Sequence, residues 1–579
     1  MSGGIDMKNE AGVSSVVGVV LLLLLVVVVS SILALTLSSA TNEAVDSTPN
    51  VIFTLSKDPQ MLYHSGGDIL YKNRLVFYDN GVDITSGVRI NSEDTWTEWR
   101  TGQAIKLPGG YYVANLTIIA LDSLGREQLL YRGSGAVSTP LPTPEPTPNP
   151  YYTVGSDHAD GFATVAEFVE SLNIWSNALY GADVAKCSGN AIAFKRDVPI
   201  GGEPIRITAG MGTVSLTNLG DGTLSEVKFT RAPGYEGELL VISSGAGLQT
   251  PGANLILDGM GQVAASPLLV INSGGSLVVN GYRITLINNI NPTGNGGALH
   301  NEGSVSVTVY LNVSGNTAMN GAGIYNLGVM TLNSPSVITD NAASENGGGI
   351  YNEGQLTSGS LVNVSGNTAM NGAGIYNLGG LTLSSPNEIK DNVALEKGGG
   401  IFNGGPGPVS IKGPITQNSA KYGGGVYNEG SISPFEGTIS GNTASISGGG
   451  VYNKGTYKFS GVSTVTNNNA QSGSGGGIYN EGSIPSFEGT ISGNTASISG
   501  GGVYNKGTST FKWTSTITSN KAQYGGGVYN TGTVPTFGGS ISGNTATIQG
   551  GGLYNTNSFT LGGSSIAGNT APLNPDRYG

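Results

Sequence analysis

The sequence contains few of the residues that disulfide-linked domains and metalloenzymes depend on. Among its 579 residues there are one cysteine, Cys187, and three histidines, and charged residues make up only 11%. A single cysteine excludes an intramolecular disulfide, so packing and hydrogen bonding must stabilise the fold. The net charge of −12 provides no excess of basic side chains to neutralise phosphates, and no nucleic-acid partner is expected.

Residues that carry out chemistry are also sparse. Between Asp258 and Asp576 the only aspartates are Asp340 and Asp391, and arginine is absent from 284 to 576. A β-helix enzyme acting on polysaccharides needs clustered carboxylates or an acid–base pair. We expect the two aspartates on one corner about 10 Å apart, so no catalytic residue, metal or cofactor site is predicted. Residues 191–295 leave the enzyme alternative open, because they carry these charged side chains in no recognisable arrangement: Asp197, Glu203, Arg206, Asp221, Glu226, Arg231, Asp258 and Arg283.

The repeats lack the helical periodicity of helical solenoids. Apolar residues come in bursts of two or three, separated by Gly, Asn, Ser and Pro, and the 95 glycines recur at fixed intervals. The phrase Gly-Gly-(Gly/Ala)-(Ile/Val/Leu)-(Tyr/Phe/His)-Asn recurs every 25 to 27 residues, with its asparagine at 301, 326, 352, 377, 403, 428, 453, 480, 505, 530 and 555. A second phrase, typified by Ile439-Ser-Gly-Asn-Thr-Ala, has its asparagine at 316, 341, 367, 392, 418, 442, 468, 494, 520, 544 and 569.

These two phrases in one period predict a right-handed parallel β-helix over 191–579. A unit of this length closes one turn with three short strands and three corners, and turns stack about 4.8 Å apart. Asparagines in register can form hydrogen-bonded ladders, and Asn and Gly tolerate the left-handed backbone of tight corners. Residues 312–328 and 363–379 are identical, and 429–456 and 481–508 differ only in Ser-Pro versus Pro-Ser. We infer that duplication added two turns at a time.

The longest apolar segment lies near the N-terminus. Residues 13–37 contain no charge and would form a helix of about 37 Å, enough to cross a bilayer. Lys8 before this segment, and Glu43 and Asp46 after it, weakly favour placing the rest of the chain outside the cell. We therefore expect a single-pass membrane protein with most of its chain extracellular. An ordinary uncleaved signal anchor is one interpretation of the segment.

A more specific interpretation comes from the residues around it. Residues 8–18, Lys-Asn-Glu-Ala-Gly-Val-Ser-Ser-Val-Val-Gly, and residues 63–68, Tyr-His-Ser-Gly-Gly-Asp, resemble the N-terminal region of archaeal type IV pilins. The resemblance implies that 1–12 is a leader, cleaved between Gly12 and Val13, and that 13–37 remains in a membrane or a filament core. It covers about 8–137, and Ser14-Ser15 stands where the family commonly has Ser-Pro.

Three segments separate this helix from the repeats. Residues 46–137 alternate between apolar and polar residues and predict a small antiparallel β-domain. Residues 138–150 are proline-rich, so we expect an extended, semi-rigid linker. In 151–190, apolar residues at helical spacing over 162–179 predict a helix that caps the open end of the solenoid, and a separate functional helix is the alternative.

The repeat itself resembles that of chlamydial polymorphic membrane proteins and of adhesin-like β-helix proteins of methanogens. The resemblance covers about 277–571 and rests on the pattern Ser-Gly-Asn-Thr-Ala followed by Gly-Gly-Gly-Val-Tyr-Asn. It implies surface display, adhesion and self-association, and it supplies no catalytic residue.

An aromatic position in every turn is the main candidate binding site. It is occupied by Phe402 and by Tyr325, Tyr351, Tyr376, Tyr427, Tyr452, Tyr479, Tyr504, Tyr529 and Tyr554, and His300 takes the same position in the first repeat. If the preceding aliphatic residue points inward, the ring points outward. The column would then offer rings to a glycan or a protein, or the rings would only stack on one another and stiffen the sheet.

Three sequons, at Asn115, Asn312 and Asn363, are candidate glycosylation sites, although the last two also fit duplicated strand sequence. Taken together, these patterns predict a surface-anchored, adhesin-like or structural protein. The expected partners are the membrane, other pilin-like subunits, and glycans or proteins of other cells. A pilus-like filament subunit and a polysaccharide-acting enzyme of the pectate-lyase class are the alternatives.

Overall fold

The computed structural model describes residues 51–132 and 164–579, apart from gaps at 56–60, 80–81, 91–95, 101–102, 109–112, 114–115, 122–126, 169–183, 202–203, 221 and 462. The chain forms two compact units, Met1–Glu145 and Pro146–Gly579. Among the described residues, no helix is both long enough and apolar enough to cross a membrane. The leader 1–12, the processing site Gly12–Val13, the helix 13–37 and the linker 138–150 all lie outside the described residues.

The first unit is built from short strands that pair in antiparallel fashion. One sheet has the order β1 (Val51–Leu55), β2 (Met61–Gly67), β8 (Ala104–Lys106) and β6 (Arg89–Ile90). The other has the order β10 (Glu127–Arg132), β9 (Leu116–Leu121), β4 (Leu75–Asp79) and β5 (Val82–Asp83), and β3 (Leu70–Tyr71) pairs with β7 (Glu98–Trp99).

The segment 63–68 places a histidine in the core of this unit. His64 is fully buried between Phe53 and Trp99, with ring centroids 6.2 and 5.7 Å away. Its Nε2 lies 2.7 Å from the carbonyl oxygen of Asp68. The histidine therefore links the end of β2 to the turn that follows it.

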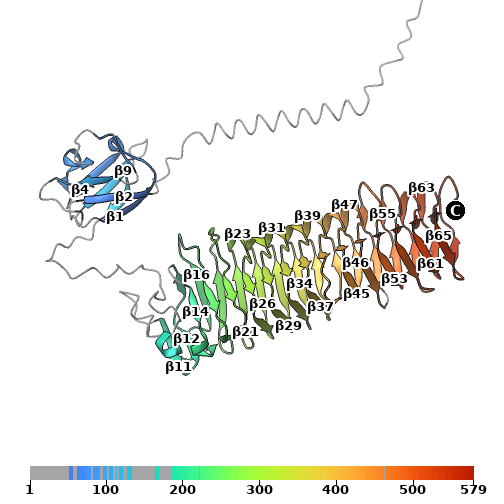
Figure 1. The fold of residues 1–579 in the computed structure, drawn as a ribbon, viewed down its shortest axis with the longest axis horizontal. Coiled ribbons are helices and arrows are strands. Elements are labelled where there is room, and N and C mark those ends of the chain that lie inside the picture. The colour runs from blue at the N-terminus through green and yellow to red at the C-terminus, as the bar shows by residue number, and fades with distance from the viewer. Residues whose placement is uncertain are drawn as a thin grey trace, which may run out of the picture. The chain divides into compact units, whose positions relative to one another are not determined.

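The second unit is a parallel β-solenoid of the right-handed type, as the repeat predicted, and Figure 1 shows its turns stacked one on another. Its four sheets are named here by their first strands. The β11 sheet runs from β11 (Ala185–Ser188) to β65 (Ser558–Leu561), and the β13 sheet from β13 (Val198–Ile200) to β66 (Ser565–Ala567). The β14 sheet runs from β14 (Ile205–Ile207) to β67 (Arg577–Tyr578), and the β23 sheet from β23 (Ile290–Asn295) to β63 (Thr545–Gln549).

Most turns contain four strands, so the prediction of three was wrong from Ile290 onward. One such turn comprises β30 (Ser336–Thr339), β31 (Ala342–Asn346), β32 (Ile350–Asn352) and β33 (Gln355–Ser358). The β13, β14 and β11 sheets surround the main core of Ile, Leu, Val and Phe. The buried apolar residues of the additional β23 sheet are alanines, in clusters separate from that core. A side chain this small fits because the glycine-rich phrase lies opposite it.

The N-terminal end of the solenoid is closed by an antiparallel strand and a helical turn. β11 pairs antiparallel with β12 (Ala191–Phe194), which interrupts the parallel stacking. The helical turn at 165–168 starts from a capping box, in which the backbone N–H groups of Thr164 and Glu167 each donate to the other's side chain. Val165 and Phe168 are buried in the solenoid core.

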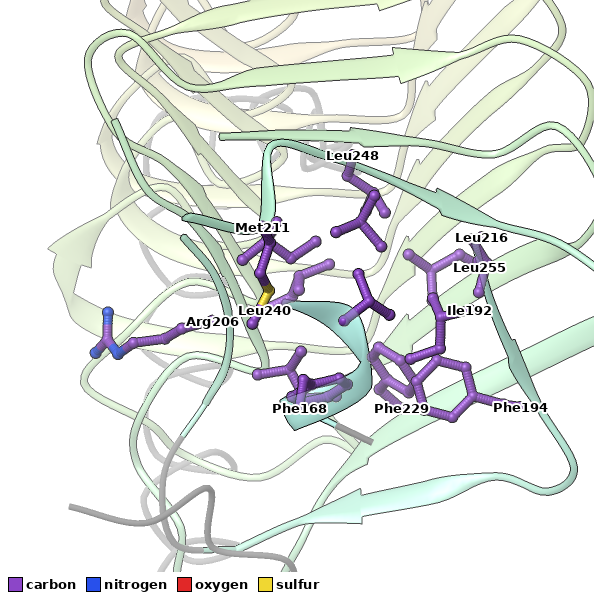
Figure 2. Close-up of a pocket in the computed structure, with 14 residues that line it drawn as sticks. Phe168, Ile192, Phe194, Arg206, Met211, Leu216, Phe229, Leu240, Leu248 and Leu255 are labelled. Carbon is purple, nitrogen blue, oxygen red and sulfur yellow. The ribbon is translucent and has the colours of Figure 1, made fainter. Parts of the chain in front are cut away.

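A cavity of about 30 Å³ lies beneath this helical turn and is lined almost entirely by apolar side chains. Figure 2 shows Phe168, Phe229 and Phe194 along its lower side, Met211 and Leu248 at its upper side, and the guanidinium of Arg206 directed away. The capping helix predicted over 162–179 stays a prediction, because only 164–168 of it belong to the described part of the chain.

Candidate functional surface

The aromatic column forms one continuous stack on the outer face of the β14 sheet. Its strands pair in register, so each ring lies directly over the ring of the next turn. From Tyr325 to Tyr578, neighbouring ring centroids are 4.5 to 5.6 Å apart, with interplanar angles of 3 to 27°. His300 continues the stack at the other end, 5.1 Å from Tyr325.

This stacking determines what the column can offer to a ligand. The preceding aliphatic residues, such as Ile350, point into the core, and the rings point outward, as strand alternation requires. However, the faces of each ring between the two ends are covered by its neighbours. What remains accessible is ring edges and hydroxyl groups, so binding by face-on stacking of a sugar would require rings to separate.

Access differs along the column. Four rings are buried: Phe402, Tyr427 and Tyr452 in its central part are 5%, 2% and 9% exposed, and Tyr351 nearer its N-terminal end is 9% exposed. Lys397 covers the central part, with its Nζ 5.0 Å from the centroid of Tyr427, and the ring of Tyr422 packs edge-on against Tyr452. The tyrosines at 325, 376, 479, 504, 529 and 554 are half-buried, which leaves them as the accessible part of the predicted binding stripe.

Carboxylates line the column on one side. The hydroxyl of Tyr351 donates to Glu353 at 2.6 Å, and that of Tyr427 donates to Glu429 at 3.2 Å. Burial raises the pKa of Tyr427 to about 12, and the negative charge of Glu429 adds to the effect. Burial and the charges of Tyr504 and Glu481 raise the pKa of Tyr479 to about 12. These two tyrosines are therefore uncharged at neutral pH.

Two asparagine ladders run along the solenoid, one after the strands of the β14 sheet and one at the corner between the β13 and β23 sheets, and both are almost fully buried. In the ladder that follows the aromatic column, each Nδ2 donates to the Oδ1 of the next turn at 2.7 to 2.9 Å, from Asn301 to Asn555. In the second ladder the corresponding distances are 2.9 to 3.0 Å, from Asn316 to Asn569. The carboxylate of Asp576 accepts the last bond, at 3.1 Å.

The comparisons with known proteins bear on this repeat. Residues 335–353 match the Chlamydia polymorphic membrane protein repeat. The match covers β30 to β32 and includes Asn341, Tyr351 and Asn352, one member of each column. No curated protein and no solved structure matches the chain. The pilin-like interpretation of 8–137 stays a prediction.

Several charged residues of 191–295 have structural partners, whereas Glu203 and Asp221 lie outside the described residues and Arg206 is exposed. Lys228 forms an ion pair with Asp258 at 2.6 Å, and its backbone N–H donates to Asp197. Arg283 pairs with Glu226 at 2.9 Å. Arg231 is buried, and it donates to the backbone oxygens of Tyr235 and Gly237 and to Asn289. Through these hydrogen bonds, Arg231 connects the loop after β16 (Glu226–Arg231) to a later turn of the solenoid.

The two isolated aspartates of the repeats are corner residues. Asp340 and Asp391 have φ angles of 57° and 55° and each directly precedes an asparagine of the second ladder. Other turns have Gly, Asn, Gln or Ser at this corner, with φ between 56° and 71° from Asn288 to Gly568. Aspartate suits the position because it tolerates the left-handed backbone. Among the described residues, no three His, Cys, Asp or Glu side chains are grouped to hold a metal ion.

The two sequons in the repeats lie on strands of the β13 sheet. Asn312 is in β26 (Leu311–Ser314) and Asn363 is in β34 (Val362–Ser365), both half-buried and two turns apart in register. Asn115 lies outside the described residues.

Sequence reasoning missed two aromatic features. Tyr578 extends the outer column, and its spacing of 24 residues from Tyr554 was a usable signal. A second column, of phenylalanines, fills the core beneath the β11 sheet, at 435, 459, 487, 511 and 537. Its spacing varies between 24 and 28 residues, which obscured it.

Proposed function

We propose that this chain is displayed at a cell surface and acts as an adhesin-like binding protein rather than as an enzyme. The match to a membrane-protein repeat supports the location, and the solenoid supports the mode of action. The observation that carries the proposal is the in-register aromatic column. It presents the same hydroxyl and edge groups turn after turn, so weak contacts to a repetitive glycan or protein surface would add up.

The accessible C-terminal part of the column is the proposed contact. Tyr479, Tyr504, Tyr529 and Tyr554 are half-buried, and Lys506 and Glu481 beside them form an ion pair at 3.0 Å. Hydroxyls, ring edges and a paired charge suit hydrogen bonding to a polar partner. The rings would stay stacked in such a complex, because a partner can reach the hydroxyls and the ring edges without separating the rings.

The test is binding of the full-length protein to a glycan array and to whole cells. Changing these four tyrosines together to phenylalanine keeps the stack and removes only the hydroxyls, and we expect at least a tenfold loss of binding. Tyr457→Phe is the matched control, because Tyr457 is fully buried in the core. Unchanged binding by the quadruple variant would contradict the proposed contact, and polysaccharide cleavage would favour the enzyme alternative.

The proposed anchor is the helix 13–37, left on the mature protein after cleavage between Gly12 and Val13. Mass spectrometry of the N-terminal peptide from isolated membranes tests this, with Val13 as the expected first residue. A peptide that begins at Met1 would favour a plain signal anchor. Recovery of the chain in sheared surface filaments would favour the filament subunit.

A further inference from the structure

The tyrosines of the outer column form two uninterrupted runs separated by one phenylalanine. The first run is Tyr325, Tyr351 and Tyr376, and the second is Tyr427, Tyr452, Tyr479, Tyr504, Tyr529, Tyr554 and Tyr578. Within each run every ring stacks on the next at 4.5 to 5.2 Å. Phe402 lies between the runs, 4.5 Å from Tyr376 and 5.6 Å from Tyr427.

The geometry points to a modification site: under a peroxide oxidant, stacked tyrosines of successive turns couple through their Cε carbons into dityrosine links. Two phenols each lose one electron and one proton, and the peroxide is reduced to two molecules of water. The two radicals join by one Cε–Cε bond, and the hydrogen displaced from each of these carbons restores the phenolic O–H. Each link therefore removes two hydrogen atoms from the protein.

Two features of the column favour this reaction. Coupling requires two tyrosyl radicals next to each other, and the in-register strands hold such a pair in place before oxidation begins. A phenol also oxidises more readily when a base takes its proton. Glu353 and Glu429 accept hydrogen bonds from Tyr351 and Tyr427, so their carboxylates are placed to take that proton.

Three other tyrosines of the solenoid, at 422, 457 and 524, are arranged differently. Tyr422 and Tyr524 lie edge-on to the column, at interplanar angles of 80° and 76°. Tyr457 is fully buried in the core, where it contacts phenylalanines at 435 and 459. Cross-links are thus expected along the column, where each joins strands about one repeat apart and replaces a stacking contact with a covalent bond.

The test treats dilute full-length protein with hydrogen peroxide and a haem peroxidase. Dityrosine fluorescence and mass spectrometry of the digested monomer should reveal linked peptides from neighbouring turns, each lighter by two hydrogen atoms. No link should join Tyr376 to Tyr427. In the Phe402→Tyr variant, the new tyrosine should form links to both Tyr376 and Tyr427. That result would show that coupling occurs between rings that are stacked on each other.

An alternating variant supplies the decisive comparison. Changing Tyr351, Tyr452, Tyr504 and Tyr554 to phenylalanine preserves the stack but leaves no two tyrosines adjacent, so linked monomer should fall at least tenfold. Its control removes four tyrosines outside the column, Tyr71, Tyr78, Tyr282 and Tyr310, and should retain full linking. Equal linking in the two variants would overturn the proposal, as would tyrosine oxidation with links only between molecules. Circular dichroism confirms that each variant is folded.

Discussion

At the scale of single residues, the buried asparagines connect each turn to the next. Asn442 accepts from the backbone N–H and the Nδ2 of Asn418 through its Oδ1, at 2.9 and 3.0 Å. Its own Nδ2 donates to the carbonyl of Ile415 and to Asn468. These groups lie away from water, so losing the asparagine would leave several of them without partners.

We therefore predict that Asn442→Ala lowers the free energy of unfolding by about 2–4 kcal/mol. Asn469→Ala is the matched control: Asn469 points outward from the β23 sheet and is half-buried, so its loss should change stability by less than about 0.5 kcal/mol. Urea unfolding followed by circular dichroism measures both variants. Similar midpoints would show that the ladder contributes little.

The stacked tyrosines predict a loss of stability at alkaline pH. Burial raises the pKa of Tyr427 and Tyr479 to about 12, and burial and hydrogen bonding to Glu353 also raise that of Tyr351. In the unfolded chain a tyrosine ionises near about 10. The stabilising contribution is thus complete below that pH and is lost as pH rises through the folded pKa.

Accordingly, the urea midpoint should hold steady up to about pH 10 and fall between about pH 10 and 12. Ultraviolet titration should show phenolates of the column appearing later than those of the unfolded protein. A variant with phenylalanine at 351, 427, 452 and 479 should show a shallower fall. A midpoint unchanged by pH 12 would contradict the burial of these hydroxyls.

At the scale of secondary-structure elements, two glycine corners differ in the space around them. Gly398, the first glycine of its phrase, and Gly441, at the corner before a ladder asparagine, both have φ of 65°. A Cβ at Gly398 would collide with the carbonyl oxygen of Ile401. A Cβ at Gly441 would find its nearest neighbour, Cγ of Gln417, at 3.6 Å.

Gly441→Asn should therefore cost less than about 1 kcal/mol, because asparagine tolerates the left-handed backbone and stands at the same corner at 467. Gly398→Asn should cost more than about 2 kcal/mol, because backbone atoms must move. Thermal unfolding of the two variants compares them directly. Equal losses would mean that φ alone, not space, selects glycine at 398.

The same elements show how far sequence reasoning reaches. The period, the parallel stacking and both ladders follow from spacing alone, because strands in register place equivalent residues of successive turns directly above one another. The fourth strand of each turn could not be predicted in this way. The sequence of β31 and its equivalents is typical of a corner, because alanine is their only inward apolar residue. The rings of the column are placed by alternation, but whether a ring face is free depends on the neighbouring turn.

At the scale of the whole molecule, the solenoid behaves as a sum of turns that contact only their neighbours. The near-identical segments 429–456 and 481–508 lie 52 residues, or two turns, apart. Removing 429–480 places Glu481 directly after Asn428, where the original sequence also has a glutamate. Every column would then continue in register across the junction.

This deletion should yield a folded solenoid about 10 Å shorter, because two turns of about 4.8 Å are lost. Small-angle scattering measures the length, and the circular dichroism signal of β-structure per residue should be unchanged.

A deletion of 429–466 is the control: it removes about one and a half turns and joins Asn428 to Asn467, so strands of different sheets would meet and core residues would face water. This second protein should unfold or aggregate, since a register error in a parallel stack affects every column at once. If both deletions fold equally well, the columns are not what holds the turns together.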